Sequence, residues 1–229
     1  MGSVIGKESV AEPAFEVLME QHTQGTKVPY ELRRYGERFI AETKMNNYAG
    51  GDDNSPFRVL AQYIGVFGNP QNEAAESISM TAPVVKKQGG TGTTIAMTAP
   101  VMKSAGDGDG NKTMAFVLPA EYNDLSQIPK PTNPAVQIKS IPPQVGVVHR
   151  YSGRMDDARS ENIALQLADQ LRKDGIEMSD SHAAQSYSGF FYNPPFCLPP
   201  FRRNEVWLEL TTEQAEKLVQ NFNPTNTVN

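Results

Sequence analysis

The chain has 229 residues, of which 38% are hydrophobic and 21% charged, and its formal net charge is −5. This composition is typical of a globular protein with one large or two small domains, and it excludes a disordered chain. The sequence has no basic stripe, which argues against nucleic-acid binding, and no apolar run long enough for a membrane span. A single cysteine, Cys197, excludes an intrachain disulfide framework and a cysteine zinc cluster. We expect a cytoplasmic protein, with plastid association as the alternative.

Short segments of alternating apolar and polar residues in the first half of the chain are typical of half-buried strands. Residues 1–12 lack this pattern and are expected to form a flexible tail. A helix is expected from Pro56 to Phe67, with Ser55 as its cap and a glycine and a proline shortly after its end. The expected strands are 15–21, a pair within 30–45 that pivots at Gly36, 78–85, 95–102 and 113–119.

The order of elements repeats after a proline- and asparagine-rich connector at 121–134. A second helix is expected at 155–175, with Asp156 as a cap and Gly175 as its stop, and a terminal helix at 211–222. The expected strands are a pair within 135–153 joined at a Pro-Pro turn, 186–195 and 204–210. Two short sheets that carry one helix each can bury their apolar faces by packing together or by closing into a barrel.

The phrase Met-Thr-Ala-Pro occurs twice, in ISMTAPVV (78–85) and in IAMTAPVM (95–102), which predicts two strands of one hairpin, bent at their prolines. Both strands can line the core, or their methionines can form the wall of a ligand cavity. The preceding helix has two apolar stripes and only a narrow polar strip at Arg58 and Gln62. It is therefore either covered by protein on two sides or has one stripe facing a pocket.

ISMTAPV after a helix of pattern FxxLxxYI, together with SYSGFFYNPP and RRNEVWLEL, resembles the SOUL/haem-binding protein family over roughly residues 13–210. The doubled MTAP phrase is similar to plant and algal-type members. The resemblance implies an α+β fold: a distorted antiparallel β-barrel from two pseudo-repeats, about 13–119 and 135–210, each carrying one helix. Residues 211–229 are then a C-terminal extension. The fold is also similar to the ligand-binding domains of bacterial multidrug regulators.

The resemblance further implies reversible binding of haem or another tetrapyrrole beside the first helix, as a carrier or buffer and without a catalytic cofactor. Arg58 is the cation for a propionate, and apolar side chains cover the ring. The chain has three histidines, of which His149 is the candidate axial ligand, with a structural role as its alternative. The expected tetrapyrrole-binding residues are Arg58, Leu60, Ala61, Ile64, Phe67, Met80 and Met97.

Two other functions stay open at this point. A protein-interaction or scaffold protein could use residues 103–113 and 190–201 as its contact surface. A tetrapyrrole-modifying enzyme is the third interpretation, but the sequence contains no Ser-His-Asp order, metal-spaced histidine pair or glycine-rich phosphate loop. The charged run from Arg202 to Glu205 predicts an ion pair that pins the last strand.

Overall fold

The computed structural model describes residues 11–22, 26–45, 55–82, 84–87, 112–154, 157–193 and 197–222. Its strands are β1 (Phe15–Gln21), β2 (Tyr30–Tyr35), β3 (Arg38–Lys44), β4 (Val84–Lys87), β5 (Thr113–Val117), β6 (Gln137–Ile141), β7 (Gln144–Tyr151), β8 (Ser188–Phe191) and β9 (Asn204–Leu210). Its helices are α1 (Pro56–Ile64), α2 (Asp157–Lys173), α3 (Asp180–Ser186) and α4 (Thr212–Phe222), with short 3-10 turns η2 (Leu125–Gln127) and η3 (Pro199–Phe201).

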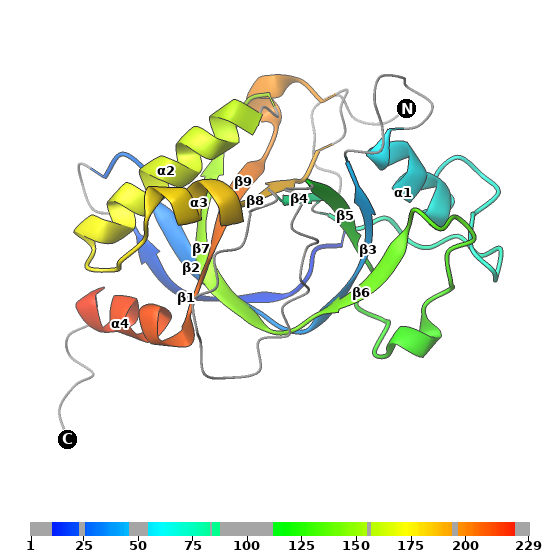
Figure 1. Cartoon of the computed structure of the whole chain (residues 1–229), viewed down its shortest axis with the longest axis horizontal. Coiled ribbons are helices and arrows are strands. Elements are labelled where there is room, and N and C mark those ends of the chain that lie inside the picture. Colours follow the sequence, from blue (N-terminus) through cyan, green and yellow to red (C-terminus); the bar gives the residue numbers. More distant parts are fainter. Residues whose placement is uncertain are drawn as a thin grey trace.

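The antiparallel sheet has the strand order β1-β2-β7-β9-β8-β4-β5-β3-β6. It is curled by a bent two-stranded ribbon, in which β2 and β3 form one strand and β6 and β7 the other. Strands β2 and β3 pair with β7 and β6 in one unbroken register across the bend, with Tyr35 opposite Gln144 and Arg38 opposite Ile141. One half of this ribbon, β2 and β7, lies near one end of the strand order, and the other half, β3 and β6, forms the opposite end. The ribbon therefore joins the two ends, and the sheet curls round into a distorted, partly open barrel (Figure 1). The predicted α+β barrel fold is confirmed.

The strand pairing is the same in the two halves of the chain. Strand β5 lies between β3 and β4, and β9 lies between β7 and β8, while β4 and β8 pair with each other. Each half carries a helix on an outer flank of the barrel, α1 on one side and α2 on the other (Figure 1). This arrangement is that of two pseudo-repeats; the residue boundaries given above for the repeats and the domain stay a prediction.

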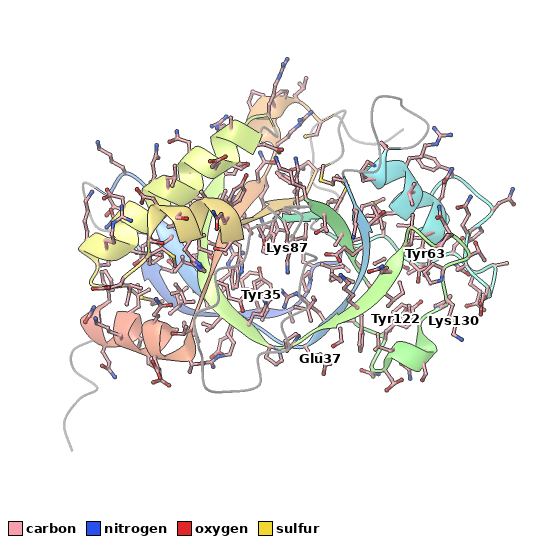
Figure 2. All side chains as sticks on the ribbon, viewed as in Figure 1. Tyr35, Glu37, Tyr63, Lys87, Tyr122 and Lys130 are labelled. Carbon is pink, nitrogen blue, oxygen red and sulfur yellow. The ribbon has the colours of Figure 1, made fainter. Side chains whose placement is uncertain are left out.

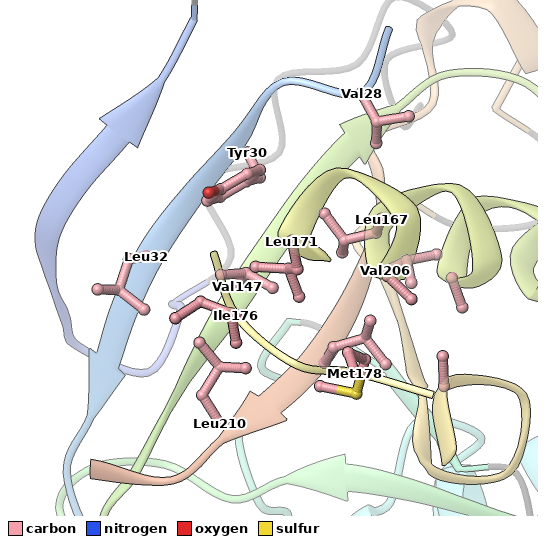
Figure 3. Packing of buried hydrophobic residues seen from close by; sticks show 14 of the residues in the cluster. Val28, Tyr30, Leu32, Val147, Leu167, Leu171, Ile176, Met178, Val206 and Leu210 are labelled. Atoms are coloured by element: carbon pink, nitrogen blue, oxygen red, sulfur yellow. The ribbon is translucent and has the colours of Figure 1, made fainter. Parts of the chain in front are cut away.

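Helix α2 covers the outer face of the ribbon and of β9. Its buried side chains Leu167 and Leu171 pack against Leu32, Val147 and Val206 from the strands beneath (Figure 3). The helix stops where expected, because Gly175 takes a positive φ of 89° that side chains with a Cβ rarely adopt. The apolar face of each of these strands therefore points outward to the helix, which leaves the opposite face for the barrel interior.

Helix α1 begins at the expected place but ends at Ile64, so the predicted end at Phe67 is wrong. The Ser55 side chain accepts a hydrogen bond from the Arg58 backbone N–H and caps the helix. Gly65 turns the chain out of the helix with a φ of 86°. The helix therefore ends about one turn before Phe67, the end that the sequence predicted from Gly68 and Pro70.

Both apolar sides of α1 are covered by protein. One side packs on β3 and β5, and on the other side the connector contributes buried Ile128 and Val136. The Tyr63 hydroxyl donates a hydrogen bond of 2.8 Å to the Pro129 carbonyl, which ties the connector to the helix. The sequence left open whether α1 is covered by protein on two sides or has one apolar stripe facing a pocket. Over Pro56–Ile64, the helix is covered on two sides.

Two further expectations need correction. Strand β4 contains only the end of the first MTAP phrase, because Ile78 and Met80 lie outside the sheet and Thr81 forms an isolated bridge with Ala11. The second phrase, 95–102, lies outside the described residues. The sequence analysis predicted no helix between Gly175 and residue 186, but the short helix α3 lies there, capped by Ser179, and contains His182. No helix in the described ranges is long and apolar enough to cross a membrane.

Candidate functional site

An exposed apolar surface lies at the end of α1. Val66 and Phe67 follow the helix directly, and the Phe67 side chain is 58% exposed. The Ile78 backbone N–H donates to the Ile64 carbonyl at 3.0 Å, and this bond anchors the segment that carries Met80, which is 40% exposed. We call Val66, Phe67 and Met80 the α1 surface.

The α1 surface is bordered by a cation. The Arg58 guanidinium carbon lies 5.5 Å from the centre of the Phe67 ring, within the range of a cation–π contact. Haem presents a flat apolar macrocycle and anionic propionates, so apolar side chains beside an arginine fit its chemistry. The residues at the end of α1 therefore suit a shallow site for such a ring.

The predicted ring-binding residues fall into three groups. Leu60, Ala61 and Ile64 are buried in the core cluster between α1 and the sheet, so they support the surface from beneath. Arg58, Phe67 and Met80 reach solvent. Met97 lies outside the described residues. A role of any of these residues in ligand binding stays a prediction.

The candidate iron ligand His149 is half-buried on β7. Its Nδ1 lies 2.6 Å from the Pro29 carbonyl oxygen. Because a carbonyl only accepts, Nδ1 carries the proton and donates it, which leaves Nε2 with a lone pair. Burial lowers the pKa of His149 below its ordinary value, and the bond to Pro29 opposes this effect. No cluster of three or more metal-ligating side chains occurs within the described part of the chain.

One end of the barrel interior is filled by a charged network centred on Glu205. This carboxylate is fully buried and accepts hydrogen bonds from Arg33, at 2.9 Å and 3.2 Å, from Arg203 and from the Tyr192 hydroxyl. Burial opposes its ionisation, but the hydrogen bonds and charges of Arg33 and Arg203 outweigh burial and hold the pKa of Glu205 below its usual range. The predicted ion pair at the start of the last strand is confirmed. The charges of Arg33, Arg203 and Glu205 are paired with one another within the protein.

The middle of the barrel is an aromatic layer. Tyr35, Phe190 and Trp207 pack together with Val148; the Tyr35 and Trp207 rings meet edge to face at 5.4 Å, and the Phe190 and Trp207 rings stack at 6.1 Å. Trp207 is the single tryptophan of the chain and is buried. The layer separates the Glu205 network from the other end of the barrel.

That other end contains a cavity of about 90 Å³. Figure 2 shows Tyr35 and Lys87 within the curl of the sheet. Apolar side chains of β3, β4 and β5, among them Ile40 and Val117, form its wall together with the aromatic layer. The polar groups that line it are Arg38, Lys87, Gln144, Ser186, Ser188 and Glu209.

A larger open groove of about 460 Å³ lies outside the barrel, beside the ends of β2 and β7 and the turn η3. It is lined by Arg150, Arg202 and Arg203 and by Phe201, which is 56% exposed. Its volume lies within the range of pockets that hold small organic molecules. The groove is therefore a second place to test for a ring-sized ligand.

Sequence reasoning did not find the polar groups of the cavity. Arg38 and Lys87 lie on β3 and β4, which are far apart in the sequence, and only the sheet register brings them to one interior. The available signal was strand alternation in VVKK: neighbouring lysines must point to opposite faces, so one of Lys86 and Lys87 turns inward.

The fold is a distorted barrel with a partly open interior cavity, an outer groove and the α1 surface, and small molecules usually bind proteins in clefts and cavities of this kind. Residues 10–209 match the SOUL heme-binding protein family, and the chain belongs to this family. Among solved structures, it is similar to the C-terminal domain of EcmrR, with a TM-score of 0.50, 11% identity, and 81% of this chain and 98% of that chain covered. It is also similar to a hydrolase from Listeria innocua, with a TM-score of 0.47, 10% identity, and coverage of 82% and 94%. These identities relate the folds alone, and a comparison with curated proteins found no match.

Proposed function

We propose that this protein binds haem or another tetrapyrrole reversibly at the α1 surface and acts as a carrier or buffer in the cytoplasm. Membership of the SOUL heme-binding protein family supports the ligand class. The observation that carries the location is the exposed Phe67 ring beside Arg58. The macrocycle covers the apolar side chains, and Arg58 pairs with a propionate carboxylate.

Neither helix α1 nor the α1 surface contains a histidine. Helix α1 packs on β3 and β5, whereas His149 lies on β7 toward the other flank of the barrel (Figure 1). Binding then rests on apolar contact and on the propionates, which haem and metal-free porphyrins share. Such a site accepts both kinds of ring with similar affinity, which suits a buffer more than an enzyme that uses the iron.

A protein-interaction surface is the second candidate function. The observation that favours it is the exposed apolar pair Leu198 and Phe201 at the end of the proline-rich segment. Phe201 is also a matched control for Phe67, because the two phenylalanines are exposed to nearly the same degree at separate places.

The test is a titration of the purified protein with haemin and with protoporphyrin IX, followed by absorbance and by Trp207 fluorescence. We expect both rings to bind, Phe67→Ser to weaken binding about tenfold, and Phe201→Ser to leave it unchanged. No response to either ring at micromolar concentrations contradicts the function. If only Phe201→Ser loses ring binding, the ring binds in the groove beside η3. If only haemin binds and His149→Ala abolishes this binding, the site lies on β7.

A further inference from the structure

The barrel cavity contains two cations that no carboxylate contacts directly. The Arg38 guanidinium donates to the Gln144 side-chain oxygen at 2.6 Å and lies 5.0 Å above the Tyr35 ring. The Lys87 ammonium makes no side-chain hydrogen bond and no ion pair with any residue that the structure describes. Burial lowers the pKa of both side chains, even though Glu209 acts in the opposite direction on each. Both cations thus lose hydration without gaining an ionic partner.

The nearby carboxylate, Glu209, is engaged elsewhere. It accepts a hydrogen bond of 2.9 Å from the Gln144 side chain, whose oxygen in turn accepts from Arg38. A single negative charge therefore stands against two positive ones at this end of the barrel. Glu42, which also faces Lys87, is paired with Lys139.

At the opposite end of the barrel interior, the buried cations are paired with carboxylates of the protein. There, Arg33 and Arg203 both contact the Glu205 carboxylate, and Arg33 also contacts Glu31. Burying an unpaired cation costs free energy, and a bound anion offsets that cost. The two ends share one barrel and one aromatic layer but differ in charge balance.

We propose that the barrel cavity binds a small organic carboxylate with an apolar body, whose oxygens are held by Arg38 and Lys87 and whose body packs on Trp207. This site is separate from the α1 surface and does not depend on tetrapyrrole binding. An apolar cavity of about 150 Å³ in another protein accommodates benzene, so the smaller volume of about 90 Å³ here excludes a macrocycle and holds a benzoate-sized acid only when part of its body projects through the open side.

The cavity walls supply both a binding surface and a reporter. Ile40 and Val117 form an apolar floor, and the buried Trp207 ring lines the same space. Because Trp207 is the only tryptophan, all tryptophan emission comes from the wall of this cavity. A small acid that enters the cavity should therefore change this emission by contact with the indole ring.

The test titrates the full chain with benzoate and hexanoate and with two isosteres of benzoate, neutral benzamide and cationic benzylamine. Calorimetry and Trp207 fluorescence follow binding, and sodium phosphate serves as a probe for an anion without an apolar body. The key variant is Lys87→Met, and Lys86→Met is its control. Lys86 is the neighbouring residue on β4, but it points outward and pairs with Asp157.

We expect benzoate to bind with a Kd of about 1 mM or tighter, and Lys87→Met and Arg38→Met to weaken it about tenfold. Lys86→Met should bind as the wild type does, and benzamide, benzylamine and phosphate should bind at least tenfold more weakly than benzoate. Lys87→Met should also raise the urea midpoint, since it removes a half-buried cation without an ion pair. Equal binding of benzylamine, unchanged benzoate binding in Lys87→Met, or no response to either acid overturns the proposal.

Discussion

Replacing Leu60 with alanine and, separately, Phe67 with alanine distinguishes the packing of α1 from its exposed end. Leu60 is 0% exposed in the cluster between α1 and the sheet. Removing such a side chain takes away its transfer free energy and leaves a cavity, so the free energy of unfolding should fall by about 3 kcal/mol. Phe67 is 58% exposed, so less than half of its area is buried and the loss should be about 1 kcal/mol.

The two variants should rank in the opposite order for ligand binding. Phe67→Ala removes a side chain that the ring would cover, so the affinity for haemin should fall about tenfold. Leu60→Ala changes a residue beneath the surface, so the folded fraction should bind haemin within about twofold of the wild type. Urea unfolding followed by circular dichroism gives the stabilities, and haemin absorbance well below each midpoint gives the affinities.

One outcome refutes this reasoning. If Leu60→Ala loses binding while Phe67→Ala retains it, the helix must move away from the sheet when ligand binds, and the buried stripe becomes the ring contact. If Phe67→Ala lowers the free energy of unfolding as much as Leu60→Ala does, the side chain at the end of α1 is packed against protein in solution. Unchanged slopes of unfolding against urea confirm that each variant unfolds from a native state of the same compactness.

Three further variants test the interior of the barrel and the histidine on β7. Glu205→Gln removes the buried carboxylate that pairs with both Arg33 and Arg203, and leaves Arg33 with Glu31 alone. It should lower the free energy of unfolding by about 3 to 5 kcal/mol, measured by urea unfolding, whereas a loss below about 1 kcal/mol would contradict the network. Burial lowers the pKa of His149, so the neutral ring is favoured in the fold: stability should be complete above about pH 6.5 and fall as the pH drops below it, less so in His149→Gln. Gly146→Ala would place a Cβ 2.6 Å from the Trp207 ring, so it should cost about 1 to 3 kcal/mol and change the tryptophan emission; a variant with unchanged emission would contradict this packing.

Local patterns were sufficient to predict most of the elements. The strands at 15–21 and 204–210 agree with β1 and β9 at both ends, because each is a short apolar-rich run flanked by proline or polar residues. The Ser55 cap and the Gly175 stop were read correctly for the same reason: each acts through the backbone within one turn. The end of α1 was missed because the chain already leaves the helix at Gly65, one turn before Gly68, although both glycines have a positive φ.

The site was harder to predict because burial depends on contacts that are distant in the sequence. Leu60 and Phe67 lie in one apolar stripe of the sequence pattern, yet the chain turns at Gly65, and one is buried while the other is exposed. The connector covers the second stripe of α1, and no local pattern indicates that it does. Likewise Arg38 and Lys87 reach one cavity only through the pairing of β3, β5 and β4.

The uncompensated charge in the cavity arises where the two halves of the barrel differ. Strands β5 and β9 occupy equivalent places, each between a long strand and a short one. Strand β9 contributes Glu205 and Glu209 to the interior, whereas β5, with the sequence TMAFV, contributes no charge. The cations near β5 therefore have no counterpart of Glu205, and a free carboxylate would take its place.

This asymmetry predicts that an internal carboxylate on β5 replaces the ligand. Ala115 lines the cavity and pairs with Val85, so it lies diagonally across from Lys87 on the same face, within reach of a longer side chain. Ala115→Glu should abolish benzoate binding and raise the pKa of Lys87, measured by NMR titration of its ammonium group. Ala115→Gln, of the same size but neutral, should be the less stable of the two because it leaves both cations unpaired. A glutamate variant that is less stable than the glutamine variant would show that Arg38 and Lys87 do not attract an anion at this place, since the internal carboxylate would then meet no favourable charge.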